Sequence, residues 1–271
     1  SVIIILHATK DPNRKQKKSL SQLVDVFAKC NRLLVHTIND LNRLKDIGLV
    51  KNVSLLPHGI VMRRDISIKS SSKLSAIFSS KNGNRSIASY GFCLPNKGYK
   101  ELIRSVHFLK QRRMDINLTI YSAIYSKEYE WVYQELLDLI DELSLEDCVS
   151  VDNRFLEESV ILDNLAKHDL LIFPYQSSNE SSSAAVRFGL SVFKPVLVTP
   201  LPIFDDVNNL VEYLPGFSSR EIATYLYDWF EKNNNYRISE EKIKLIKDRS
   251  FFNVSNRLFS LINSMEKDKF K

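Results

Sequence analysis

Short apolar runs alternate with longer amphipathic runs along most of the chain, and this alternation limits the possible folds more than any other feature. The short runs have the length and composition of strands, and they cover 2–6, 33–37, 53–57, 86–92, 116–122, 149–153, 169–175 and 195–199. The longer runs predict helices over 19–30, 38–48, 100–111, 127–143, 156–168, 179–195, 219–232 and 239–267. A regular order of strand, helix and strand indicates right-handed βαβ units, so the sequence predicts an α/β fold with parallel sheets.

One stretch interrupts the alternation. Residues 63–85 are polar and serine-rich, with "SIKSSSKLSAIFSSKNGN" in the middle. Such composition is typical of a linker, and we expect a domain boundary there.

Charge and cysteine content narrow the class of protein. The chain has 271 residues, a net charge of +6 and three cysteines without metal-ligand spacing. Sparse, odd cysteines fit a reducing compartment, and no apolar run approaches the roughly 18 residues of a membrane helix. The modest basic excess suits an anionic ligand, a nucleic acid or an anionic membrane surface. The basic run "KDPNRKQKK" (10–18) is either a solvated loop or a contact with an anionic membrane or a lipid pyrophosphate.

The strand-to-helix loops are where an open parallel sheet binds ligands. In "GFCLPNKGYKELI" (91–103), Lys97 offers a point charge for a phosphate, and Gly98 lets the backbone approach a ligand closely. Alternatively, Lys97 is an ordinary solvated lysine in such a turn.

A second loop, "NESSSAAVRFGLSVFKP" (179–195), places one carboxylate and three serines at the start of a helix. Glu180 can accept hydrogen bonds from sugar hydroxyls. The hydroxyls of Ser181, Ser182 and Ser183, together with the free N–H groups of the helix, suit a pyrophosphate or a sugar. Alternatively, Asn179 or Glu180 merely caps the helix.

Two further strand ends carry candidates. His7 follows the strand 2–6 and can face a cleft, although a lone histidine is more often structural. In "VDNRFLEES" (151–159), a nucleobase can stack on Phe155, which is otherwise a core residue.

Three segments together resemble family 4 glycosyltransferases of the GT-B fold. They are "LLVHTINDLNRLKDIGLVKNVSLLPHGI" (33–60), "SYGFCLPNKGYKELIRSV" (89–106) and "DLLIFPYQSSNESSSAAVRFGLSVFKPVLVT" (169–199). Their order and spacing agree with the family across most of the chain. The resemblance implies a complete Rossmann-like, nucleotide-sugar-binding domain over 58–249. It also implies a partial Rossmann-like, acceptor-side domain over 1–57, to which a helix within 250–271 returns. On the order of a hundred residues of that second domain are expected to be absent.

The resemblance also assigns roles to residues. Lys97 would hold the donor diphosphate, Glu180 the sugar hydroxyls, and the backbone from Ser181 to Ala184 both sugar and phosphate. His7 would contact the donor sugar, and Asn153 to Leu156 would lie near the nucleobase. The segment from Pro57 to Gly59 would cross between the domains.

Two positions depart from the family pattern. The glutamate expected to bind the ribose is replaced by Phe188, and the arginine expected beside Gly91 is replaced by Phe92. Arg187 lies near the same helix face as Glu180, and we expect it to compensate electrostatically by reaching the ribose or phosphate.

The predicted function is therefore sugar transfer with retention, from a nucleotide sugar to a glycan or lipid-linked acceptor in surface polysaccharide biosynthesis. The resemblance implies no obligatory metal or other cofactor and a cytoplasmic enzyme, with contact to the inner membrane face left open. An unpaired edge of the first sheet predicts self-association or a partner chain. The alternative is a non-catalytic nucleotide-sugar-binding or scaffold module. Nucleic acid is not an expected partner, because no motif interleaves aromatic and basic residues.

Overall fold

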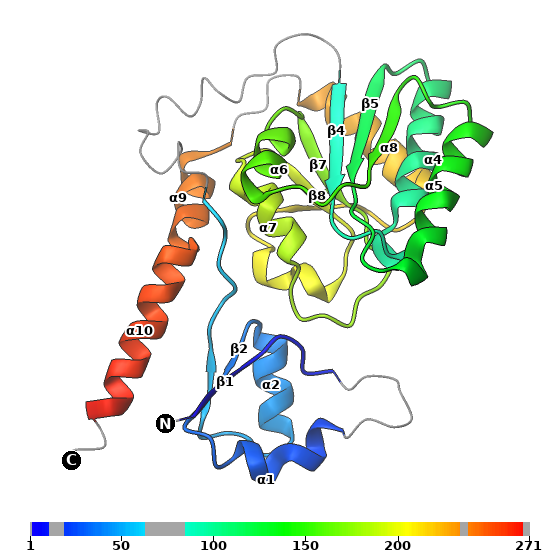
Figure 1. The fold of residues 1–271 in the computed structure, drawn as a ribbon. Coiled ribbons are helices and arrows are strands. Elements are labelled where there is room, and N and C mark those ends of the chain that lie inside the picture. The colour runs from blue at the N-terminus through cyan, green and yellow to red at the C-terminus, as the bar shows by residue number, and fades with distance from the viewer. Residues whose placement is uncertain (1, 11–18, 63–84, 234–237, 268–271) are drawn as a thin grey trace.

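The computed structural model describes residues 2–10, 19–62, 85–233 and 238–267 and contains two parallel sheets (Figure 1). The small sheet has the order β1-β2-β3, with strands Ile3–Leu6, Arg32–Val35 and Val53–Leu55. The large sheet has the order β6-β5-β4-β7-β8-β9. Its strands, from β4 to β9, are Arg85–Tyr90, Ile116–Tyr121, Val149–Asp152, Leu170–Phe173, Val196–Val198 and Glu212–Tyr213. The predicted α/β class with parallel sheets is confirmed.

Helices cover both faces of the large sheet. On one side lie α4 (Tyr99–Gln111), α5 (Glu130–Glu142) and α8 (Ser219–Lys232), and on the other lie α6 (Glu158–Leu165), α7 (Ala184–Ser191) and α9 (Glu240–Asp248). Successive strand residues point to opposite layers, so Leu170 and Ile172 join the first apolar cluster while Leu171 and Phe173 join the second. Strand β7 is therefore fully buried, as expected for a central parallel strand.

The strand order reverses between β4 and β7. From β4 the chain moves outward through β5 to β6, returns through α6 to β7, and continues outward on the other side to β8 and β9. The loops that follow β4 and β7 therefore leave the same edge of the sheet and diverge. A crevice at such a switch point is the usual ligand site of an open α/β sheet.

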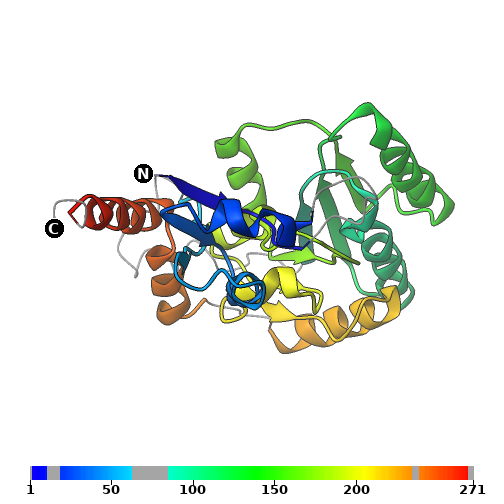
Figure 2. The same ribbon diagram turned by 90° about the horizontal axis from the view of Figure 1, so that it is seen from below.

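The small sheet is also covered on both faces. Leu33 and Val35 of β2 pack on one face with Leu44 of α2 (Ile38–Asp46), whereas Leu34 packs on the other with Val254 of α10 (Phe251–Lys267). Helix α10 extends from the large-sheet half to lie beside the small sheet (Figure 1, Figure 2).

The structure shortens several expected helices and divides another. Of the expected helix 179–195, only α7 (Ala184–Ser191) is helical. The segment 19–30 forms only a 3₁₀ turn, η1 (Leu20–Leu23), and one α-helical turn, α1 (Val24–Phe27). The segment 239–267 is two helices, α9 and α10, because the chain between them pairs with the crossing segment. Ile60 donates to the carbonyl of Arg249 and accepts from the amide of Phe251.

Several expectations fall outside the described residues or stay predictions. The linker 63–85 is described only at Arg85, and the basic run 10–18 only at Lys10. Within the described chain, β1 pairs with β2 alone, so its outer edge stays a predicted site of association. Among the described helices, none combines the length and the apolar character that crossing a membrane requires.

Gly98 offers a direct test of how the β4 and β7 loops pack. Its φ is +73°, and a Cβ there would lie 1.8 Å from the Pro174 carbonyl oxygen. Gly98→Ala should therefore lower the free energy of unfolding by several kcal/mol, because a steric clash adds to the left-handed backbone cost.

The matched control is Gly48→Ala. Gly48 has φ +96° but nothing within 4 Å of the added Cβ, so only the backbone cost of about 1–2 kcal/mol remains. Urea unfolding of both variants measures the difference, and equal losses would contradict the close approach to Pro174.

Candidate functional site

A cavity lies beyond the carboxyl ends of strands β4 to β7, at the switch point. Its lining is formed by Tyr90, Gly91, Phe92, Leu94, Lys97, Tyr121, Ala123, Arg154, Phe155, Leu156, Ile161, Tyr175, Glu180, Ser183, Ala184, Ala185 and Phe188. Lys97 and Glu180, which are far apart in the sequence, thus line one cavity. Ser183, Ala184 and Phe155 are the other predicted site residues on its wall.

The Lys97 side chain is buried and lines the cavity. Lys97 ends the 3₁₀ turn η2 (Pro95–Lys97) and is only 9% exposed. Its Nζ lies 3.9 Å from the centre of the Tyr175 ring, a cation–π distance. Within the described part of the chain its ammonium forms no ion pair. A buried charge without a counterion favours a bound anion, so Lys97 is not the solvated lysine that the alternative predicted.

The start of α7 faces the cavity through Ala184 and Ala185. The N-cap is Ser183, whose Oγ accepts a hydrogen bond from the amide of Val186 at 3.3 Å. Neither Asn179 nor Glu180 has the capping role that the alternative gave them. Glu180 instead is exposed on the cavity wall, where its carboxylate can accept hydrogen bonds.

Ser181 has a different neighbour from the one expected. Its Oγ donates to Oδ1 of Asp40 on α2 at 2.8 Å, so this buried hydroxyl joins the two halves of the molecule. Asp40 is fully buried and also accepts from Thr37 Oγ1 at 2.5 Å and from Arg43 Nη1 at 3.0 Å. Ser181 and the half-buried Ser182 are not on the cavity wall.

Gly98 and Asn153 also lie off the wall. The space beside Gly98 is taken by the Pro174 carbonyl, so the close approach that this glycine permits is to the residue that directly follows β7. Asn153 lines a separate depression together with Asp152 and Arg154, whose side chains form an ion pair of 2.7 Å.

Arg187 was expected to reach the ribose or phosphate, but in the structure it is buried and paired with Asp206. Its side chain is 2% exposed, and it donates to the Asp206 carboxylate and to the Ser183 carbonyl at 2.6 Å. Burial raises the pKa of Asp206, although the nearby guanidinium groups of Arg187 and Arg249 act in the opposite direction. Burial also lowers the pKa of Arg187. The guanidinium therefore points into the protein, toward the small-sheet half, and not into the cavity where a ribose or phosphate would lie.

Aromatic residues make up much of the wall, and sequence reasoning missed most of them. Tyr90 and Tyr121 end the neighbouring strands β4 and β5 in register, and Phe188 lies 5.0 Å from Tyr90 between ring centres. Burial raises the pKa of both tyrosines, so they stay neutral phenols. Phe155 is 82% exposed and is not the core residue of the alternative. A tyrosine near the end of each of two consecutive predicted strands was the available signal.

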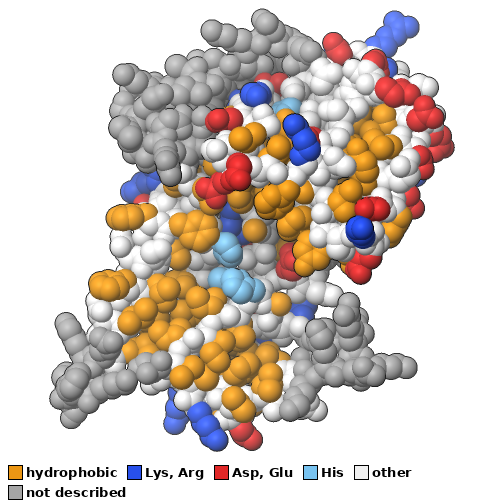
Figure 3. All heavy atoms as spheres, viewed as in Figure 1, with side chains coloured by type: hydrophobic (Ala, Val, Ile, Leu, Met, Phe, Trp, Pro, Cys, Tyr) orange, Lys and Arg blue, Asp and Glu red, His pale blue; other side chains and the backbone are white. Residues whose placement is uncertain are grey.

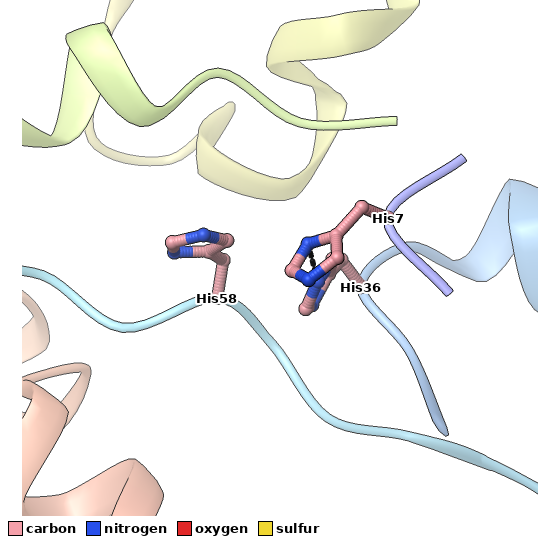
Figure 4. Close-up of side chains that lie close together, drawn as sticks. All are labelled: His7, His36 and His58. Carbon is pink, nitrogen blue, oxygen red and sulfur yellow. Dashed lines mark hydrogen bonds between the residues drawn. The ribbon is translucent and has the colours of Figure 1, made fainter. Parts of the chain in front are cut away.

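His7 lies outside this cavity. It meets His36 and His58 at the carboxyl ends of β1, β2 and β3 (Figure 4). The structure thus groups His7 with two histidines that the sequence did not single out.

The two parallel sheets match solved structures of the GT-B type, a fold of nucleotide-sugar glycosyltransferases. Comparison with solved structures finds Anabaena HepE in complex with UDP, at a TM-score of 0.73 and 14% identity, over 97% of this chain and 72% of that one. A glycosyltransferase from Rickettsia africae matches at 0.73 and 14%, over 98% and 70%. A UDP-forming trehalose-phosphate synthase from Burkholderia vietnamiensis matches at 0.75 and 10%, over 99% and 68%. Neither a protein-family model nor a curated protein sequence matches the chain. The chain therefore shares the GT-B fold, whereas membership of family 4 stays a prediction.

The buried Arg187–Asp206 pair gives a prediction about stability. Arg187→Ala should lower the free energy of unfolding by about 3–5 kcal/mol, because it leaves a buried carboxylate without its partner. The double variant Arg187→Met with Asp206→Leu should recover most of this loss, since it removes both charges. Urea unfolding measures each variant. A stable Arg187→Ala protein that has lost nucleotide binding would instead restore a role at the donor site.

Proposed function

We propose that this chain binds a nucleotide-sugar donor and transfers its sugar with retention of configuration. The observation that carries the proposal is the joint placement of Lys97, Glu180 and the start of α7 in one cavity at the switch point. Support comes from Anabaena HepE, a structurally similar protein whose structure contains UDP.

The cavity suggests an order for the donor. The diphosphate would lie against Lys97 and the first N–H groups of α7, where a positive charge and a helix dipole stabilise a departing anion. The sugar would lie against Glu180. The base would stack on the exposed ring of Phe155. In this arrangement protein charge stabilises the leaving group, in accord with the metal-independent chemistry that the resemblance implies.

The alternative is a module that binds the donor without turning it over. Phe188 on the wall, together with the inward position of Arg187, favours this alternative, because no carboxylate occupies the place expected for a ribose ligand. Donor hydrolysis or transfer separates the two, since a binding module would show nucleotide binding without release of the free nucleotide.

The remaining assignments extend this proposal. We assign residues 58–249 to the donor domain and residues 1–57 with 250–271 to the acceptor-side domain, in line with the packing of α10 on the small sheet. The acceptor would be a glycan or a lipid-linked sugar, used in the cytoplasm for a surface polysaccharide. Ile5 of β1 and Phe252 and Phe259 of α10 are exposed apolar residues that suit self-association, a partner chain or contact with the membrane surface. Figure 3 shows hydrophobic side chains gathered on the small-sheet half of one face.

The test measures donor binding by thermal shift with UDP-, GDP- and dTDP-sugars, and turnover by release of the free nucleotide. One of these donors should raise the melting temperature of the wild-type protein. Lys97→Ala and Glu180→Ala should each weaken binding or turnover roughly ten- to hundredfold, because each removes a hydrogen bond to a charged group.

Lys110→Ala and Glu142→Ala are matched controls, since both residues lie on outer helices away from the cavity. These controls should behave like the wild type. Unchanged donor binding and turnover in both Lys97→Ala and Glu180→Ala would contradict the proposed donor site.

A further inference from the structure

Three histidines from separate parts of the sequence converge where the two halves of the molecule meet. His7, His36 and His58 follow β1, β2 and β3, and one ring nitrogen from each lies within 4.8 Å of the other two (Figure 4). Ring centres are 4.8 Å apart for His7 and His36, and 5.0 Å apart for His36 and His58. None of the three lines the donor cavity.

Hydrogen bonds set which nitrogen of each ring carries a lone pair. Nδ1 of His36 lies 2.9 Å from the Leu56 carbonyl oxygen, which can only accept, so Nδ1 carries the proton. Nε2 of a neutral His36 is then an acceptor, and it lies 3.0 Å from Nδ1 of His7. In His58, Nδ1 donates to the Gly59 carbonyl at 3.1 Å, which leaves Nε2 free to bind. A backbone carbonyl that receives the second N–H is the usual support of a metal-binding histidine.

The spacing fits a small divalent ion. Tetrahedral zinc with Zn–N bonds of 2.0–2.1 Å requires nitrogens about 3.3 Å apart, close to the present distance between His7 and His36. Binding would place the ion between these nitrogens, while the proton they share moves to Nε2 of His7. His58 would approach by about an ångström or more through side-chain rotation.

The surroundings are compatible with a cation. Arg187 and Asp206, which form an ion pair, are the charged side chains that act on the cluster; both act on His36, whereas of the two only Arg187 acts on His58, so their charges offset each other only in part. Oδ1 of Asp206 is buried and has no hydrogen-bond partner within the described structure. His7 is exposed, and histidine side chains reach the surface at the waist of the face drawn in Figure 3, so an ion has a route of entry.

We propose that His7, His36 and His58 form a binding site for a divalent transition-metal ion, with zinc as the best match. Three imidazoles leave the fourth position of a tetrahedral ion open to water or to a substrate group. The site would tie together the ends of the three small-sheet strands, next to the junction with the donor half. It is separate from the donor cavity and does not depend on sugar transfer.

The test titrates zinc into untagged, chelator-treated protein by calorimetry, with no nucleotide present. One ion should bind per chain and raise the melting temperature by mass action. Cobalt should give the intense visible absorption of a four-coordinate complex. His7→Gln and His58→Gln should each weaken binding by roughly tenfold or more, because each removes a ligand.

His107→Gln is the matched control, since His107 lies on α4 and bonds with Gln111, away from the cluster. It should bind zinc like the wild type. Circular dichroism checks that every variant folds, and exposed His7 is the position least able to disturb folding. Absence of saturable binding to the wild type, binding unchanged in both His7→Gln and His58→Gln, or loss of binding in His107→Gln would overturn the proposal.

Discussion

The reversal of strand order between β4 and β7 is the constraint on which the rest of the structure depends. Crossovers between parallel strands are right-handed as a rule, so a chain that moves outward from β4 and later returns to its other side places the two loops on opposite sides of one crevice. Lys97 follows β4 and Glu180 follows β7. Their meeting is thus a consequence of topology, and it needs no direct bond between them.

A second set of contacts fixes the two halves against each other. Ser181 bonds to Asp40 across the junction, and Arg187 reaches the carbonyl of His58 at 3.4 Å while paired with Asp206. Both residues belong to the same segment as Glu180. The segment that presents the Glu180 carboxylate to the cavity therefore also contacts the small-sheet half. A relative movement of the two halves would change the position of this segment at the donor site. The three histidines stand at the same junction.

The sequence predicted what depends on local pattern. Alternating strands and helices predicted the α/β class. Lys97 and Glu180 were selected because they lie in strand-to-helix loops, where open parallel sheets bind ligands, and because the family resemblance assigns them roles. The failures involve long-range packing. Nothing near Gly98 shows that its missing side chain makes room for Pro174, and nothing near Arg187 announces a carboxylate at Asp206. The break between α9 and α10 likewise comes from pairing with the distant Ile60. The tyrosines at the ends of β4 and β5 are visible in the sequence. That they line one cavity follows only from the strand order, which the sequence did not predict.

A crystal structure of the chain with the nucleoside diphosphate of the donor that it binds would test the proposed donor site most directly. We expect the diphosphate to lie within hydrogen-bond distance of Lys97 and of the first amides of α7, with the base against Phe155. A nucleotide bound elsewhere, or a diphosphate that contacts neither Lys97 nor the start of α7, would contradict it.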